Sequence, residues 1–358
     1  MACPSQFQHF PDNADQFIDH PSHAKIGIHP FPDKLYVLTT LFNPVRYNSR
    51  YFNYKLFERH VESAGAILYT AEIAFGGRCF EITDAENPRH LQLRANDEQE
   101  IWLKENSLNL LTHRLPVSAR YVAWVDADLN FVRHDWAQET LHLLQHYQFL
   151  QMFSRAQDLG PNYEPLSSTP SFVFGEFHDP LEVDETTGKP YSYYYGQQTK
   201  DGRWSYRHPG FAWAARRSAL DLVGGLIDHT ILGSGDWMMA HALFGKVEHT
   251  ISQGYTDNYK RLAREWQARA ERHVQRNVGY MPGTVNHYFH GAKTNRQYNK
   301  RWQLLVDCKF DPLTDLKRDT QGLYALEDND GIEGDRFIKL RDGLRRYARL
   351  RDEDNPNI

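Results

Sequence analysis

The sequence is poor in cysteine and has no long apolar segment. Three cysteines in 358 residues are too few and too scattered for a disulfide framework. No apolar run approaches the roughly 20 residues that a membrane-spanning helix needs, and the amino-terminal residues lack the basic and then apolar pattern of a secretory signal. Internal repeats and low-complexity tracts are missing too. We therefore expect a soluble globular protein of the reducing cytoplasm.

An excess of positive charge is also missing. The 41 basic and 46 acidic residues give a formal net charge of -5, so the chain as a whole has no general reason to bind nucleic acid or anionic lipid. With 41% hydrophobic and 24% charged residues, the composition is that of a folded protein and not of a disordered one. The length suits two average domains or one elaborated α/β domain.

Strand and helix patterns alternate after an irregular beginning and predict a parallel sheet. Residues 1–33 carry prolines and histidines with little periodicity, so we expect an irregular arm there. Residues 35–41 and 66–71 are apolar and rich in β-branched side chains, and residues 49–64 between them have helical spacing. A strand, a helix and a second strand in this order form a βαβ unit with parallel strands.

The same alternation continues along the chain. Asn96 and Gln99 have the spacing of a helix capping box, which predicts a helix over residues 97–113. The apolar run that begins at Tyr121 and stops at the carboxylates Asp126 and Asp128, and the run of residues 149–153, predict two more buried strands. We therefore expect further strands of the same mostly parallel sheet, in an order that the sequence does not determine.

Two carboxylates, Asp126 and Asp128, interrupt the apolar run of residues 121–131. Side chains two apart in a strand project to the same face, and open α/β sheets bind their ligands at the carboxyl ends of the strands. Two carboxylates on one face there supply half of a site for a hard divalent cation, which often also holds a phosphate. Alternatively, the two residues only begin a solvated turn, where Asp is common.

Later segments add further candidate site residues. Asp236 follows a Gly-Ser-Gly segment and precedes a predicted helix, so its carboxylate is either reactive or only a helix cap. His287 and His290 end an apolar stretch, and Lys293 and Arg296 follow them. A neutral imidazole completes a carboxylate site for a transition-type ion, and nearby cations suit a pyrophosphate. We therefore expect His290 to be a metal ligand.

Three more segments stand out by composition. Residues 160–207 are rich in Pro, Gly, Ser and Tyr, with a tyrosine cluster at 191–195, and predict a long irregular loop. Residues 257–276 and 335–351 predict amphipathic helices, each with an apolar stripe and a basic opposite face. We interpret the last of these as a docked helix with a solvated charged face. Contact with a polyanion such as DNA, or with a membrane surface, is the alternative.

Four sequence blocks together resemble the nucleotide-sugar-dependent glycosyltransferases of the GT-A fold, especially the bacterial and phage branch similar to family 2. They occur in the family's order: Thr39-Thr40-Leu41-Phe42-Asn43-Pro44, Trp124-Val125-Asp126-Ala127-Asp128, Gly233-Ser234-Gly235-Asp236 and His287-Tyr288-Phe289-His290-Gly291. The resemblance covers residues 34–305 and implies an α/β fold with a Rossmann-type, mostly parallel sheet flanked by helices. Residues 160–207 would be a long irregular insertion, residues 257–276 an inserted helix, and residues 306–358 a carboxy-terminal helical extension.

The resemblance also implies roles for individual residues. Asp126 and Asp128 of the Asp-x-Asp motif, together with His290, would hold Mn2+ or Mg2+ against the diphosphate of the donor. Asp236 would be the catalytic base of an inverting enzyme, although Gly235 stands where many members have a second acidic residue. The donor-side candidates are Thr39, Thr40, Asn43, Glu72, Lys104, Lys293 and Arg296. The acceptor-side candidates are His208, Gly210, Trp213 and Trp237.

The leading hypothesis is a metal-dependent glycosyltransferase that moves a hexose from a nucleoside-diphosphate sugar, UDP above all, to an acceptor hydroxyl. The acceptor is left open between a glycan, a protein and a hydroxymethylated base of DNA, the last through the basic carboxy-terminal helix. A nucleotidyltransferase is the second enzyme class, but no glycine-rich, basic phosphate loop follows the first strand. A sugar-nucleotide-binding module without activity is the third possibility.

Overall fold

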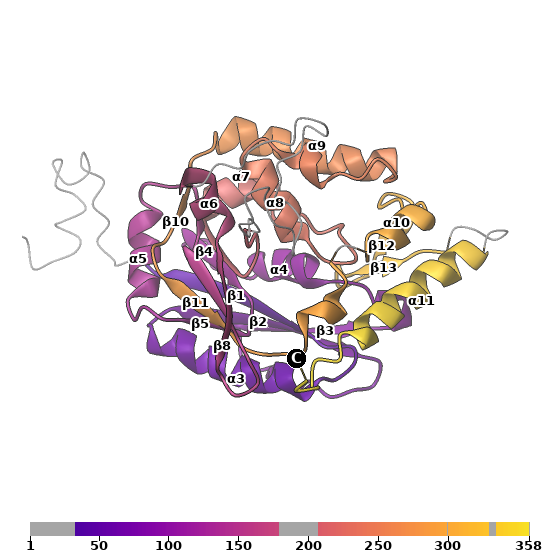
Figure 1. The fold of residues 1–358 in the computed structure, drawn as a ribbon, viewed down its shortest axis with the longest axis horizontal. Helices are drawn as coiled ribbons and strands as arrows, with labels where there is room; N and C mark the ends of the chain where they lie inside the picture. The colour runs from indigo at the N-terminus through magenta and orange to yellow at the C-terminus, as the bar shows by residue number, and fades with distance from the viewer. Residues whose placement is uncertain (1–32, 179–206, 299, 329–333, 358) are drawn as a thin grey trace, which may run out of the picture. The chain divides into compact units, whose positions relative to one another are not determined.

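The computed structural model describes residues 33–178, 207–298, 300–328 and 334–357. Its centre is a seven-stranded sheet with the strand order β10-β6-β9-β4-β1-β2-β3 (Figure 1). In this sheet β9 runs antiparallel to both neighbours, and every other pairing is parallel. The strands are β1 (Leu35–Phe42), β2 (Ile67–Phe75), β3 (His90–Ala95), β4 (Tyr121–Val125), β6 (Phe149–Gln151), β9 (Ala212–Arg216) and β10 (Val278–Tyr280). The predicted α/β fold with a mostly parallel sheet is confirmed.

Helices cover both faces of this sheet, as the uninterrupted apolar sequences of its middle strands require. Along β1, Tyr36 and Leu38 belong to one core and Leu35 and Val37 to the other, because successive side chains of a strand point to opposite faces. The core of Leu35 and Val37 is closed by α3 (Asn48–Ser63) and α5 (Trp136–Leu143). The opposite core, seen above the sheet in Figure 1, is closed by α4 (Lys104–Thr112), α7 (Arg217–Val223), α8 (Gly235–Leu243) and α9 (Asp257–His273).

A second sheet of four strands has the order β5-β11-β7-β8. Its strands are β5 (Leu129–Phe131), β7 (Arg155–Leu159), β8 (Pro165–Pro170) and β11 (Thr284–His287). β4 ends at Val125, so the strand stops at Asp126 as the sequence indicates, and the chain then enters the second sheet. Charged carboxylates are costly to bury in an apolar core, so the chain leaves the first sheet at Asp126. Leu129 pairs with His287 across β5 and β11, which brings Asp128 close to that histidine.

The predicted helix over residues 97–113 is wrong at its start. The expected capping box closes only a short 3-10 helix, η1 (Asp97–Gln99), and α4 begins at Lys104. Between them, the backbone N–H of Trp102 donates to the carbonyl of Ile231 over 2.9 Å. This tertiary hydrogen bond holds the segment out of the helix, and local helix propensity does not encode it.

The predicted irregular loop over residues 160–207 contains regular structure where it is described. β8 pairs antiparallel with β7, and α6 (Phe172–His178) buries its first two side chains. The hydrogen bonds of the second sheet thus order a segment whose composition alone indicates a loop. The tyrosine cluster at 191–195 lies outside the described residues, and so does the predicted arm apart from Asp33.

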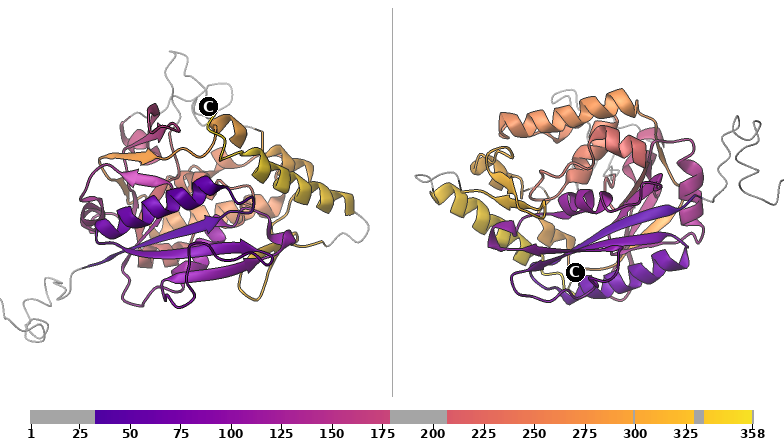
Figure 2. Two further views of the ribbon diagram at one scale, coloured as in Figure 1. Left: turned by 90° about the horizontal axis from the view of Figure 1, so that it is seen from below. Right: turned by 180° about the vertical axis from the view of Figure 1, so that it is seen from behind.

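The carboxy-terminal part packs against the rest of the chain. From Leu35 onward the described residues form one unit, which includes α10 (Gln303–Asp307), the hairpin of β12 (Leu316–Arg318) and β13 (Tyr324–Leu326), and α11 (Gly334–Leu350). Helix α11 lies beside α10 (Figure 2). Of the predicted stripe of Phe337, Leu340, Leu344 and Tyr347, it buries the last three. The helix is thus docked as expected, but Arg345 of the face expected to be solvated pairs with Glu100. Contact with DNA stays a prediction.

No described helix is both long and apolar enough to cross a membrane.

Candidate functional site

A cavity of about 540 Å³ opens where β1 and β4 end. Thr39 and Thr40 of β1 and Asp126 directly after β4 line it, so it lies at the edge where open α/β sheets bind ligands. A cavity of this volume is large enough for a small-molecule ligand or cofactor. The basic side chains that line it are Arg50, Lys104, Arg296, Arg301 and Arg351. The aromatic ones include Trp102, Trp237, Tyr255, Tyr298 and Trp302.

Three side chains converge in this cavity: Asp128, His287 and His290. Nε2 of His290 lies 3.0 Å from Oδ2 of Asp128 and 3.0 Å from Nε2 of His287. Nε2 of His287 lies 3.8 Å from Oδ2 of Asp128. One ligand atom from each residue lies within 4.8 Å of the others, which is close enough for a single metal ion. Oδ1 of Asp128 is buried and has no hydrogen-bond partner among the described residues. Carboxylate and imidazole ligands together favour a divalent transition ion.

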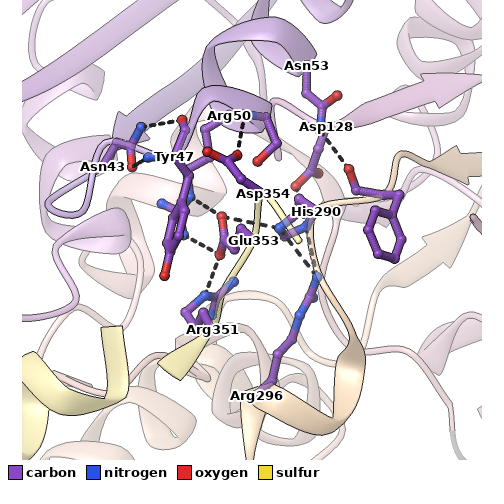
Figure 3. Close-up of polar contacts among 12 residues, drawn as sticks. Asn43, Tyr47, Arg50, Asn53, Asp128, His290, Arg296, Arg351, Glu353 and Asp354 are labelled. Atoms are coloured by element: carbon purple, nitrogen blue, oxygen red, sulfur yellow. Dashed lines mark hydrogen bonds and ion pairs between the residues drawn. The ribbon is translucent and has the colours of Figure 1, made fainter. Parts of the chain in front are cut away.

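A buried carboxylate lies beside the other ring nitrogen of each histidine. Oδ1 of Asp158 is 3.0 Å from Nδ1 of His287. Oε2 of Glu353 is 3.5 Å from Nδ1 of His290, and Figure 3 shows these two residues. A carboxylate next to Nδ1 favours the tautomer with hydrogen on Nδ1, and Nε2 then keeps its lone pair. The two lone pairs would face each other at the Nε2 contact, an arrangement that a cation stabilises.

Charged side chains surround this group. Nη2 of the Arg296 guanidinium is 3.0 Å from Nε2 of His290, so a bound metal ion would take the place of this contact. Burial alone would raise the pKa of Asp128, but the positive charge of His290 and His287 in their protonated forms, which a metal ion would replace, outweighs it and holds that pKa below its ordinary value. Asp128 therefore stays ionised, as a metal ligand must. Asp128, His287 and His290 thus fit a divalent cation such as Mn2+.

Asp126, the other acidic residue of the Asp-x-Asp motif, lies in the cavity but outside this group. Its carboxylate forms an ion pair with Lys104, the first residue of α4. Burial, opposed by Lys104 and reinforced by the charge of Asp128, raises the pKa of Asp126 above its ordinary value. Its part in metal binding, expected from the sequence, stays a prediction. The donor-side role of Lys104, which also lines the cavity, stays a prediction too.

Two more carboxylates, Asp236 and Glu105, line the same cavity. Asp236 lies in the first turn of α8, where Oδ1 accepts a hydrogen bond from the backbone N–H of Trp237 over 2.8 Å. A Cβ atom at Gly210 would lie 1.9 Å from Oδ2 of Asp236, so only glycine leaves room for this carboxylate. Burial, opposed by Lys104 and reinforced by the charge of Asp236, raises the pKa of Glu105 to about 7. Glu105 can therefore gain or lose a proton near neutral pH.

The structure brings most of the predicted site residues to the cavity. Besides Asp126, Asp128, Asp236 and Lys104, the predicted residues that line it are Thr39, Thr40, His208, Trp237, His290 and Arg296. Thr39 donates to the carbonyl of Val125 over 2.8 Å, and His208 stacks on Phe211 at 3.6 Å between ring centroids. These contacts hold the ends of β1 and of the segment before β9 against the cavity wall.

Other predicted site residues make contacts elsewhere. Asn43 binds the backbone N–H and carbonyl of Tyr47, and Lys293 pairs with Asp158. Glu72 lies inside β2, not at its end, and accepts hydrogen bonds from the backbone N–H groups of residues 81–83. Trp213 is buried in β9, where its indole donates to the carbonyl of Pro209 over 2.7 Å. None of these four side chains lines the cavity, and neither does Gly210, which only faces Asp236.

Sequence reasoning did not assign a role to several residues that the structure brings to the site. His287 was noted beside His290 but not chosen as a ligand, although a His-x-x-His spacing is a local signal for a shared site. Glu105 follows Lys104 and had no distinguishing pattern. Asp158 and Glu353 reach the histidines only through the fold, from distant parts of the chain.

Comparisons with known proteins give distant likenesses in fold only. No family model matches the sequence, and no curated protein matches it. Drosophila β1,4-galactosyltransferase 7 in complex with manganese, UDP-Gal and xylobiose is similar at 12% identity and TM-score 0.37, over 84% of this chain and 96% of that chain. The catalytic domain of the same enzyme with xylobiose gives 9% identity and TM-score 0.35 over the same shares. 4-Diphosphocytidyl-2C-methyl-D-erythritol synthase from Anaerococcus prevotii gives 9% and 0.30, over 70% of this chain and 89% of that chain.

Proposed function

We propose that the protein is a metal-dependent glycosyltransferase that moves a hexose from a nucleoside-diphosphate sugar, in the first instance a UDP-sugar, to an acceptor hydroxyl. The observation that carries the proposal is the group of Asp128, His287 and His290 in a cavity that several basic side chains also line. A divalent cation and surrounding guanidinium groups together suit a diphosphate. The position of the cavity at the ends of β1 and β4 supports the same assignment.

Each group has a proposed task in the transfer. Bound by Asp128, His287 and His290, a Mn2+ or Mg2+ ion would offset the negative charge that develops on the departing diphosphate. Arg296 and Arg351 line the same cavity and would bind its phosphate oxygens. On the opposite side of the sugar, Asp236 would accept the proton of the attacking hydroxyl. Displacement in line between these two sides inverts the anomeric carbon.

The remaining wall of the cavity suits the rest of the donor and the acceptor. Thr39 and Trp102 lie near the end of β1, where a nucleoside would have polar and aromatic neighbours. Trp237 lies beside Asp236 in α8 and lines the cavity, so its ring would contact the acceptor. The acceptor remains a choice between a glycan, a protein hydroxyl and a hydroxymethylated base of DNA.

A nucleotidyltransferase is the second candidate, since it would also use carboxylates and a metal ion. The chain segment after β1 weighs against it, because the turn at Asn43 and Pro44 carries no run of glycines to hold a triphosphate. The two candidates differ in their products, because a nucleotidyltransferase releases pyrophosphate whereas a glycosyltransferase releases a nucleoside diphosphate.

The test is incubation of the purified protein with a panel of nucleotide sugars and Mn2+, followed by measurement of free nucleoside diphosphate. We expect slow metal-dependent release of UDP from one UDP-sugar, and no release with EDTA. Candidate acceptors would then be added singly, with product detection by mass spectrometry. Pyrophosphate release from a nucleoside triphosphate would favour the second candidate. The absence of both releases and of any nucleotide binding would contradict both.

A further inference from the structure

The carboxy-terminal segment that follows α11 reaches into the candidate metal centre. Glu353 lies in this segment and is 1% exposed. Its carboxylate accepts from Arg50 of α3, 2.8 Å between Arg50 Nη2 and Glu353 Oε1, and from Nε of Arg351. The same carboxylate lies 3.5 Å from Nδ1 of His290 (Figure 3). One buried acidic side chain thus joins two basic residues to a histidine of the metal group.

The backbone around Glu353 lies close to that of Gly291. A Cβ atom at Gly291, the residue after His290, would lie 2.9 Å from the carbonyl oxygens of Arg351 and Asp352 and from Cα of Glu353. Gly291 also has a φ of +84°, a conformation that glycine adopts without strain. The tail and the histidine segment are therefore in direct contact at backbone level, which fixes Glu353 relative to His290.

The neighbouring acidic residue points the other way. Oδ2 and Oδ1 of Asp354 accept from the backbone N–H groups of Asn48 and Ser49, each over 2.8 Å, at the start of α3. The side chain of the residue before that helix makes no capping hydrogen bond, so Asp354 supplies the cap from the far end of the chain. Two adjacent carboxylates of one segment thus have separate partners, the metal group for Glu353 and a helix end for Asp354.

We propose that Glu353 is a positioning residue of the metal centre, which holds His290 through Nδ1 so that Nε2 points to Asp128 and His287. Asp158 occupies the corresponding place beside His287, at the shorter distance of 3.0 Å. A carboxylate behind a metal-bound histidine fixes the ring and makes Nε2 a better ligand, and its loss typically lowers metal affinity about 10- to 100-fold. This inference rests on the proposed metal-dependent function.

The experiment compares Mn2+ binding, measured by isothermal titration calorimetry, in wild type and three variants of the full chain. Glu353→Gln keeps the size of the side chain but removes its charge. Glu353→Asp keeps the charge that pairs with Arg50 but shortens the reach to His290, and it serves if the first variant folds poorly. Asp354→Asn is the matched control, because it alters the helix cap and leaves the histidine untouched. Circular dichroism and thermal melting establish that each variant is folded.

We expect both Glu353 variants to bind Mn2+ about 10- to 100-fold more weakly than wild type. Asp354→Asn should lower the melting temperature and leave Mn2+ affinity unchanged, because a cap affects only stability. Folded Glu353 variants with wild-type Mn2+ affinity would overturn the inference and leave the metal centre intact. An equal loss of affinity in Asp354→Asn would overturn it too, since the segment would then act only as packing. A wild-type protein that binds no Mn2+ would instead contradict the metal centre itself.

Discussion

Replacement of Glu105 by Gln should stabilise the protein at neutral and alkaline pH. Burial first, and then the charge of Asp236, raise the pKa of Glu105 from its ordinary 4.5 to about 7, although Lys104 lowers it. The folded protein therefore holds the Glu105 proton more tightly than the unfolded chain does. Gln has nearly the shape of the protonated carboxyl group and has no proton to lose, so it avoids the cost of a buried negative charge.

The direction of the pKa shift sets the pH range of the effect. The pKa of Glu105 is higher in the folded protein than in the unfolded chain, so its bound proton stabilises the folded state. This stabilisation is fully present below pH 4.5 and is lost as the pH rises through about 7. Each pKa unit corresponds to about 1.4 kcal/mol, so a difference of roughly 2.5 units lowers the stability of the wild type by up to about 3 kcal/mol at pH 8. The variant should therefore match the wild type near pH 4 and exceed it by about 2 to 3 kcal/mol near pH 8.

The assay is urea unfolding of both proteins at several pH values, followed by tryptophan fluorescence. The free energy of unfolding of Glu105→Gln minus that of the wild type should grow steadily between about pH 5 and pH 8. Glu98→Gln is the matched control, because it makes the same chemical change at an exposed residue. A Glu105 difference that stays constant with pH, or a variant less stable than the wild type at pH 8, would refute the reasoning.

Three further predictions concern the transfer reaction. Asp236→Asn should lower turnover about a hundredfold to ten-thousandfold with donor affinity nearly unchanged, as loss of a general base does. Unaltered turnover, or retained anomeric configuration of the product by NMR, would contradict the assignment of Asp236 as the base. Gly210→Ala should displace the Asp236 carboxylate, because the new Cβ would lie 1.9 Å from it. Turnover should therefore fall, whereas Mn2+ affinity measured by calorimetry should stay at the wild-type value. Wild-type turnover would show that the site tolerates the methyl group. If hydroxymethylated DNA is the acceptor, transfer to it should fall steeply as salt rises from about 50 to 200 mM, and salt-independent transfer would exclude electrostatic docking of DNA.

The sequence predicted the elements whose pattern is local. β1, α3 and β2 follow from apolar runs and helical spacing, and α9 and α11 follow from their apolar stripes. The two carboxylates after β4 were also recognisable, because an abrupt change from apolar to acidic residues at a strand end is visible without any structure. Each of these signals lies within about 20 residues, the range over which periodicity is informative.

The sequence could not predict the features that depend on distant contacts. The path of the chain after β4 is set by the pairing of β5 with β11, which lies far along the chain. That pairing, and not any local pattern, brings His287 to Asp128. Glu72 likewise reads as a strand end, but β2 continues to Phe75 because it pairs with β3 to that point. Glu353 reaches His290 only after α11 has packed, so no spacing in the sequence indicates its position.

The central claim is that Asp128, His287 and His290 form one metal centre on which donor binding depends. Its most direct test is calorimetric titration of Mn2+, and then of UDP, into the wild type, His287→Ala and the control His146→Ala, which removes an exposed histidine outside the cavity. We predict one Mn2+ site in the wild type and the control. Folded His287→Ala should lose more Mn2+ affinity than the roughly 10- to 100-fold that loss of an outer carboxylate costs, and its UDP binding should weaken as well. Wild-type Mn2+ affinity in His287→Ala, or UDP binding to the wild type that is undiminished by EDTA, would contradict the claim.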